Sequence, residues 1–445
     1  MISGILYGVL TFVTLLIITR IVSRYFEEKA FVRVIILSSF CYGVFIAVFV
    51  RAIFGDILED PAYFPDAYFY LHYAMKKVAE WRGEGTLGYI PLATRGYTYF
   101  IAIIFSIFGQ NIYAVIFVQL LLASLIPILT FSIAREFFST KTAKLSALLI
   151  ALFPDLYVWA SFALKEILAV SSICLAVLGF LKFRKDPNWV KFLATVGSLI
   201  ILLFVRPHIA LFLALVFMFA SIWPVTIKKL LWLPIGAAVL AIFISQAGLS
   251  GFLTLVSETP LPVYNRGEIL VTGTLPELFR MIISGQLLST FLLGIGRYLI
   301  SPLPWQATNA YQALIPGIIL WYFVLPMAIL GVIGAIRGRK PVYILMFIVL
   351  FLVLWYGLIV AGTDPRWRLM IVPFMCIFGA YGFQLLKKSL SGVVIWISGV
   401  LVIWLFLSFY ASGREFVLWV LVPTLVIGAL VGLAVFRKRA GEVIR

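Results

Sequence analysis

The chain has 445 residues, of which 63% are hydrophobic and only 12% are charged, and this composition excludes a soluble globular protein. The net charge of +17 could suggest a nucleic-acid partner, but 21 of the 35 lysines and arginines fall in short segments between apolar runs. Basic residues in short connecting loops follow the positive-inside rule of membrane proteins, so we expect membrane lipid and no nucleic acid as a partner.

Apolar runs of transmembrane length recur along the chain, since a helix needs about 20 apolar residues to cross a bilayer. We count thirteen: 2–22, 34–54, 112–134, 144–160, 164–183, 191–205, 209–227, 230–247, 313–336, 341–361, 369–386, 392–411 and 416–436. The sequence therefore predicts an all-α polytopic membrane protein, with a single transmembrane domain over residues 1–445.

The run 96–109 (GYTYFIAIIFSIFG) is apolar but too short to cross, so we place it as an interfacial or re-entrant helix. With that choice every basic connection faces the cytoplasm and the N-terminus faces out. Two outer loops are then long: 55–111, which carries juxtamembrane helices, and 248–312. The C-terminal helices occupy 313–445. An active site is expected on the outer face of a multi-pass protein of the plasma (inner) membrane.

The sequence contains few residues that could bind a metal ion or form a disulfide bond. The two histidines, His72 and His208, are too few for a histidine-rich site. The three cysteines, Cys41, Cys174 and Cys376, lie far apart inside apolar runs, so we expect small buried residues and predict no metal site.

The first outer loop contains a helical pattern at residues 65–81 (PDAYFYLHYAMKKVAEW). Asp66, Tyr70, Tyr73 and Lys77 recur at a spacing that puts them on one helix face. A carboxylate such as Asp66 beside an apolar wall can act as a general base. Its structural alternative is a helix N-cap, and the two roles are not exclusive.

Two further polar groups lie at outer span ends. Lys165 and Glu166 form a functional candidate because charge at the membrane edge is costly; alternatively, Lys165 extends to the interface while Glu166 complements the helix N-terminus. Arg206, followed by Pro207 and His208, can hold a phosphate with paired donors or serve as an interfacial anchor.

Further arginines fall on the outer side, against the positive-inside bias, and several arginines opposite an aspartate suit a substrate with a phosphate and a hydroxyl. They are Arg266, Arg280, Arg297, Arg366 and Arg368. Nearby aromatic rings could stack on sugars or form an interfacial belt. These are Tyr63, Phe64, Tyr68, Phe69, Trp81, Trp305 and Trp367.

The order of five motifs over residues 60–385 resembles the glycosyltransferase C superfamily, especially its protein O-mannosyltransferases and lipid A aminoarabinose transferases. The motifs are PDAYFYLHYA (65–74), GYTYFIAIIFSIFG (96–109), AREFF with KTAKLSALLIALFPDLYVWASFALKEIL (134–168), VRPHIALFLAL (205–215) and PRWRLMIVPFMCIFGAYGF (365–383). The span 2–22 precedes the usual first helix, and Ala67 stands where relatives often have a second acidic residue.

The resemblance implies an inverting transfer of a sugar from a polyprenyl-phosphate-linked donor to an acceptor hydroxyl on a glycan, lipid or protein. It assigns the catalytic carboxylate to Asp66. It places substrate-binding residues at Glu166, Arg206, Arg366 and Trp367. From their positions alone we add Lys165, Arg297 and Tyr70 as substrate-binding candidates. The resemblance fixes no cofactor and leaves a divalent cation open.

Two other functions remain open at this stage. A transporter or flippase of a lipid-linked saccharide predicts charged residues in the middle of spans, whereas the candidates lie near span ends. A polysaccharide polymerase or ligase would also have many spans and paired arginines, but the early loop with Asp66 argues against it.

Overall fold

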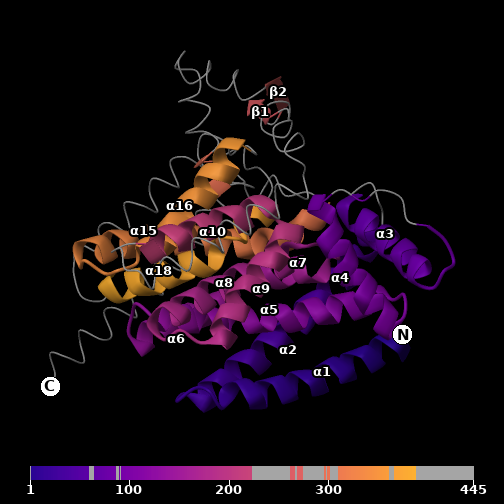
Figure 1. The fold of residues 1–445 in the computed structure, drawn as a ribbon, viewed down its shortest axis with the longest axis horizontal. Helices are drawn as coiled ribbons and strands as arrows, with labels where there is room; N and C mark the ends of the chain where they lie inside the picture. The colour runs from indigo at the N-terminus through magenta and orange to yellow at the C-terminus, as the bar shows by residue number, and fades with distance from the viewer. Residues whose placement is uncertain are drawn as a thin grey trace.

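The structure is a computed structural model that describes residues 2–59, 65–86, 90, 92–222, 261–265, 268–273, 295–296, 298–300, 309–359 and 365–386. Figure 1 shows that these residues form a bundle of long, roughly aligned helices. The helices before the hairpin are α1 (Ile2–Ser23), α2 (Lys29–Glu59), α3 (Pro65–Trp81), α4 (Leu92–Phe108), α5 (Ile112–Arg135), α6 (Thr140–Ala151), α7 (Pro154–Ser161), α8 (Glu166–Lys185), α9 (Trp189–Val205) and α10 (Pro207–Ile222).

The later elements are shorter or more varied. They are the antiparallel strands β1 (Leu261–Asn265) and β2 (Glu268–Gly273), the 3₁₀ helix η3 (Asn309–Leu314), α15 (Ile315–Arg337), α16 (Tyr343–Leu354), the π-helix η4 (Trp355–Ile359), α17 (Pro365–Arg368) and α18 (Val372–Leu386). The all-α class is therefore confirmed, and one hairpin is its exception within the described residues.

Helix α5 lies at the centre of the bundle, where it packs against α1, α2, α6, α7, α8 and α18. Its start is set by Asn111, whose side chain accepts a hydrogen bond from the backbone N–H of Tyr113 at 2.9 Å. Helices α15 and α18 pack closely because glycine at their crossing lets the two backbones approach each other. A Cβ on Gly331 would lie 1.9 Å from the carbonyl oxygen of Phe378. Small residues at helix crossings are typical of membrane bundles.

The protein is a multi-pass membrane protein. Among the described residues, four helices are long and apolar enough to span a bilayer: Lys29–Phe54, Ile112–Arg135, Glu166–Lys185 and Gln312–Arg337. Large apolar side chains such as Phe45 and Val48 are exposed on α2, as a lipid-facing surface requires. The predicted spans 230–247, 392–411 and 416–436 lie outside the described residues, so the count of thirteen stays a prediction.

The predicted span 144–160 is broken rather than continuous. Helices α6 and α7 meet at an angle of 43°, and together they pass the same test as one bent span. The break arises because Pro154 cannot continue a helix and Phe153 is extended. The hydroxyl of Tyr157 donates to the carbonyl of Ala151 at 2.9 Å and ties the two halves together.

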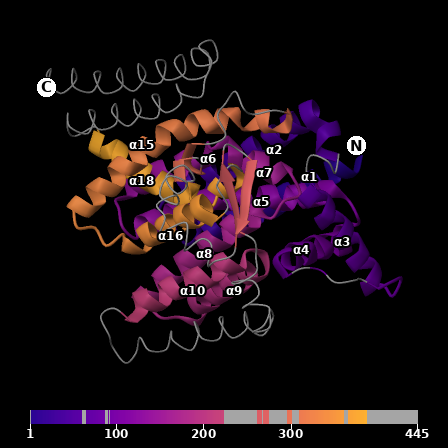
Figure 2. The same cartoon turned by 90° about the horizontal axis from the view of Figure 1, so that it is seen from above.

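Helices α3 and α4 lie side by side at one end of the bundle, as both views show (Figures 1 and 2). The N-terminal part of α4 contacts the end of α9, where a Cβ on Gly96 would lie 2.6 Å from the carbonyl oxygen of Phe204. Its last residue, Phe108, accepts a hydrogen bond from Tyr7 near the start of α1. Both ends of α4 thus contact the same end of the bundle, which is the arrangement expected of a helix that does not cross.

The basic residues of the connecting turns lie at the end of the bundle opposite to α3 and α4. Arg135 at the end of α5 pairs with Glu28 at 2.9 Å, and Lys185 at the end of α8 pairs with Glu136 at 2.6 Å. Arg184 donates to the hydroxyl of Tyr343 at 2.7 Å. The structure therefore separates these basic turns from α3 and α4 by the full length of α5 and α8.

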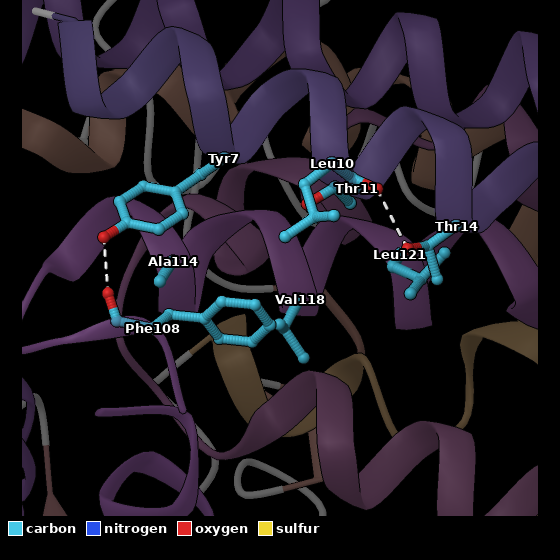
Figure 3. Close-up of a pocket in the computed structure, with 8 residues that line it drawn as sticks. All are labelled: Tyr7, Leu10, Thr11, Thr14, Phe108, Ala114, Val118 and Leu121. Atoms are coloured by element: carbon cyan, nitrogen blue, oxygen red, sulfur yellow. Dashed lines mark hydrogen bonds between the residues drawn. The ribbon is translucent and has the colours of Figure 1, made fainter. Parts of the chain in front are cut away.

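An apolar pocket lies between α1, α5 and the end of α4 (Figure 3). The hydroxyl of Tyr7 points to the carbonyl of Phe108, and Thr14 donates to the carbonyl of Leu10 at 2.9 Å. The hydroxyls of Tyr7 and Thr14 are thus bonded to nearby backbone carbonyls, and the pocket lining is mainly apolar.

Two of the three cysteines are buried as expected, Cys174 and Cys376. The prediction is wrong for Cys41, which is exposed on α2. The cause is that an apolar run in a membrane protein has a lipid-facing side as well as a buried side, and sequence periodicity did not separate the two.

Candidate functional site

Two ion pairs join segments that are far apart in the sequence. Arg366 on α17 donates from Nη1 to Oδ2 of Asp66 on α3 at 2.7 Å. Arg206, between α9 and α10, donates from Nη2 to Oε1 of Glu166 on α8 at 2.6 Å. Each pair therefore consists of one carboxylate and one guanidinium from a different part of the fold.

Tyr70 and Lys165 join the two pairs into one site. The amine of Lys165 lies 5.8 Å from the centroid of the Tyr70 ring. Burial raises the pKa of the Tyr70 hydroxyl, and the nearby charges of Glu166 and Asp66 raise it further. We call these six residues the charged cluster: Asp66, Tyr70, Lys165, Glu166, Arg206 and Arg366.

The two ion pairs differ in exposure. The side chains of Glu166 and Arg206 are 1% and 11% exposed, whereas those of Asp66 and Arg366 are 46% and 23% exposed. One pair is thus enclosed by protein, and the other opens to the surroundings. A molecule arriving from outside would meet Asp66 first.

Local structure explains how each acidic residue is placed. Asp66 is the second residue of α3, which begins at Pro65, so it belongs to the first helical turn and lies inside the N-cap position that the alternative proposed. Glu166 is the first residue of α8 and complements the positive end of the helix dipole. It also pairs with Arg206, which the structural alternative for this residue did not foresee.

Lys165 lies in the turn between α7 and α8, and only 9% of it is exposed. It therefore does not extend to the membrane interface, and this alternative is wrong. Burial lowers the pKa of its amine to about 7, and the positive charge of Arg206 acts in the same direction. A buried amine that titrates near neutrality can change its charge when an anion arrives.

Aromatic rings connect the two arginine-bearing segments. Trp367 stacks on Tyr356 with ring centroids 5.8 Å apart, and Tyr356 stacks on Tyr298 at 5.7 Å. The hydroxyl of Tyr356 lies 3.3 Å from Nε2 of His208, which follows Arg206 by two residues. Tyr356 belongs to the π-helix η4, and π-turns are frequent at functional sites.

The predicted face of α3 is only partly used by the cluster. Tyr70 points into it, but Lys77 pairs with Glu80 at 2.5 Å and lies over the ring of Tyr99. The hydrogen bond with Glu80 raises the pKa of Lys77. The spacing correctly predicted a helix, but only the part of its face with Asp66 and Tyr70 belongs to the charged cluster.

Sequence reasoning missed Asp155 and Tyr97. Asp155 pairs with Arg368 at 3.7 Å, and both side chains are buried. Tyr97 packs edge-on against Tyr70 with centroids 4.9 Å apart and accepts a hydrogen bond from Gln119. An aspartate inside the apolar run LFPDLYVWA was a signal that could have singled out Asp155.

Several predicted residues lie outside the described residues and receive no placement. They are Tyr63, Phe64, Arg266, Arg280, Arg297 and Trp305. Within the described part of the chain, no group of three or more His, Cys, Asp or Glu side chains is placed to hold a metal ion. Asp66 and Glu166 each face a guanidinium instead, so no step is assigned to a divalent cation.

A family model matches part of this chain, and several solved structures are similar to it. Residues 94–247 match the family model described as dolichyl-phosphate-mannose-protein mannosyltransferase. That range contains Lys165, Glu166 and Arg206, whereas Asp66 and Arg366 lie outside it. The resemblance to the glycosyltransferase C superfamily is thereby confirmed, and the match supports a glycosyltransferase.

The chain is also similar to the oligosaccharyltransferase of Archaeoglobus fulgidus, solved by crystallography with a tethered acceptor peptide containing the NVT sequon. The identity is 14%, the TM-score is 0.44, and the alignment covers 82% of this chain. The chain spans about half the length of that protein, since 50% of it is covered. The search of curated proteins gave no match.

Proposed function

We propose that this protein is an inverting membrane glycosyltransferase that moves a sugar from a polyprenyl-phosphate-linked donor to an acceptor hydroxyl. The observation that carries the proposal is the charged cluster, in which an accessible aspartate lies among three cationic side chains. The family match over residues 94–247 supports the transferase class.

The charge of the cluster suits a lipid-linked phosphodiester. When the Lys165 amine is protonated, Lys165, Arg206 and Arg366 supply three cationic groups against the two carboxylates of Asp66 and Glu166. One positive charge is left for the single negative charge of the donor phosphate. When the sugar leaves, the phosphate gains a second negative charge, and fixed guanidinium groups stabilise it as it develops.

Asp66 is proposed as the general base. It takes the proton of the acceptor hydroxyl, whose oxygen then attacks the anomeric carbon on the face opposite the phosphate. The bond between that carbon and the phosphate oxygen breaks, and its electron pair stays with the lipid phosphate. A donor phosphate that binds Arg366 would compete with Asp66 for the guanidinium and so leave the carboxylate available for the proton.

The remaining cluster residues take supporting roles in this proposal. Glu166 holds the Arg206 guanidinium in place, and the Tyr70 ring packs against the Lys165 amine. Trp367, beside Arg366, offers a ring on which a sugar can stack. We further propose that the donor enters from membrane lipid, that the site faces the extracytoplasmic side of the plasma membrane, and that the acceptor is a glycan, lipid or protein.

The experiment uses purified full-length protein with radiolabelled polyprenyl-phosphate mannose, because the matched family model names a lipid-phosphate mannose donor. Wild-type protein should release lipid phosphate and transfer the label to membrane-fraction acceptors. Asp66→Asn should lower turnover by about a thousandfold while donor binding persists, because only the proton acceptor is lost.

Asp186→Asn is the matched control, since Asp186 pairs with Lys191 at the far end of the bundle. It should leave turnover unchanged. Full activity of Asp66→Asn would end the assignment of the base. A wild-type protein that carries the donor across vesicles without cleaving it would instead be a flippase.

A further inference from the structure

A further ion pair, separate from the two pairs of the charged cluster, takes no part in the proposed reaction. Oδ2 of Asp155 on α7 and Nη2 of Arg368 on α17 are 3.7 Å apart, and the two side chains are 3% and 1% exposed. The guanidinium also lies 5.2 Å from the centroid of the Trp321 ring on α15. Arg368 thus contacts two other helices of the core.

Arg368 and the cluster residue Arg366 share the four-residue helix α17. Residues two apart on a helix point in different directions, so one arginine can reach Asp66 while the other reaches Asp155. Such a short helix cannot fix its own orientation. Its neighbours must therefore hold it, and the hydroxyl of Tyr298 does so in part by donating to the carbonyl of Trp367 at 3.2 Å.

Close packing fixes the carboxylate of Asp155. A Cβ added to Gly317, in the first turn of α15, would lie 1.6 Å from Oδ1 of Asp155. Only glycine allows the carboxylate to lie there. Helix α7 itself packs against α2, α5, α8 and α15, so Asp155 is held by the rigid core of the bundle.

A buried ion pair of this kind is weak as a source of stability, because the cost of desolvating both charges can exceed their attraction. It is well suited to set one geometry, since a buried guanidinium must lie where its carboxylate is. Because Arg368 lies two residues after Arg366 on α17, fixing Arg368 also fixes the position of Arg366.

We propose that Asp155 and Arg368 are positioning residues that hold α17 so that the Arg366 guanidinium meets Asp66 and the donor phosphate. The functional part of this inference rests on the proposed function, and its structural part does not. Neither residue touches the substrate. Their effect is exerted through Arg366.

The test is a double-mutant cycle on the full-length protein, with polyprenyl-phosphate mannose as the probe. Asp155→Asn should weaken donor binding about tenfold, because a displaced Arg366 guanidinium no longer forms paired hydrogen bonds with the donor phosphate. In an Arg366→Ala background the same change should weaken binding no further. The double variant Asp155→Asn with Arg368→Gln, which leaves no unpaired buried charge, should recover folding but not donor affinity.

Gly317→Ala provides an independent variant, because it displaces the carboxylate and alters neither charged residue. It should reproduce the loss of donor affinity if Asp155→Asn fails to fold. Gly197→Ala is its matched control, since a Cβ on Gly197 meets nothing within 4 Å. That control should bind donor as the wild type does.

Cryo-electron microscopy of Asp155→Asn supplies a readout that needs no substrate. The 2.7 Å contact between Arg366 and Asp66 should be lost in the variant. Retention of that contact, or a loss of affinity that multiplies with that of Arg366→Ala, would overturn the inference. If the wild-type protein binds no donor, the proposed function fails, and the structure of the variant still decides the positioning role.

Discussion

The two ion pairs of the charged cluster have the same chemistry but different surroundings. Glu166 and Arg206 are enclosed, so their geometry is fixed and neither is free to exchange its partner for water. Asp66 and Arg366 are open, so an arriving phosphate or hydroxyl can replace one partner. Exposure therefore decides which carboxylate is suited to a proton transfer, although both are adjacent to an arginine.

Lys165 leads to a prediction about pH. Because burial lowers the pKa of its amine to about 7, the amine is charged below that pH and neutral above it. An ammonium attracts the donor phosphate and a neutral amine does not, so donor affinity should fall as the pH rises through about 7.

The measurement is the dissociation constant of polyprenyl-phosphate mannose across this pH range. Lys165→Arg serves as the comparison, because a guanidinium stays charged throughout. Its affinity should remain flat where that of the wild type declines. Identical pH profiles for the two proteins would remove Lys165 from the phosphate site.

Among the secondary-structure elements, the short ones position the site and the long ones hold it. Asp66, Lys165, Arg206 and Arg366 come from the start of α3, two helix junctions and the one-turn helix α17. Tyr356 in η4 links the segments of Arg206 and Arg366 through His208 and Trp367. The framework beneath them depends on close contacts between long helices, above all between α15 and α18.

The crossing of α15 and α18 leads to a prediction about stability. Gly331→Ala should destabilise the protein by about 1–3 kcal/mol, because the new methyl group would overlap the carbonyl of Phe378 and push the helices apart. Thermal unfolding in detergent measures the effect. Gly197→Ala, in open space on α9, should be neutral or slightly stabilising. Equal stability of the two variants would show that the crossing is not tightly packed.

The whole molecule has two chemically distinct ends. One carries α3, α4 and the charged cluster, and the other carries the basic turns that pair with Glu28 and Glu136. Positive-inside reasoning assigns the basic end to the cytoplasm. A lipid-linked donor would then meet the cluster at the outer edge of the bilayer.

This arrangement leads to a prediction about sidedness. In a variant with the three native cysteines replaced by alanine, Gly85→Cys should react with a membrane-impermeant thiol reagent in intact cells. Pro187→Cys, in the turn between α8 and α9, should react only after permeabilisation. Both positions are exposed in the structure, so access depends on the membrane alone. The reverse pattern would place the cluster on the cytoplasmic side.

The sequence by itself determined the class of the protein and most helix positions. Apolar runs set the spans because a bilayer permits little else, and the helix predicted at residues 65–81 has the same bounds as α3. The sequence also selected Asp66, Lys165, Glu166, Arg206 and Arg366 as candidates, because charged residues at span ends are few and conspicuous.

Only the tertiary structure decided how these residues combine. Periodicity describes one helix at a time, so it could not show that Arg366 meets Asp66, 300 residues earlier in the chain, or that Glu166 meets Arg206. For the same reason it could not show the exposure of Cys41 or the pairing of Asp155 with Arg368. Partners and burial are properties of several helices packed together, and packing is set by contacts between residues that the sequence holds far apart.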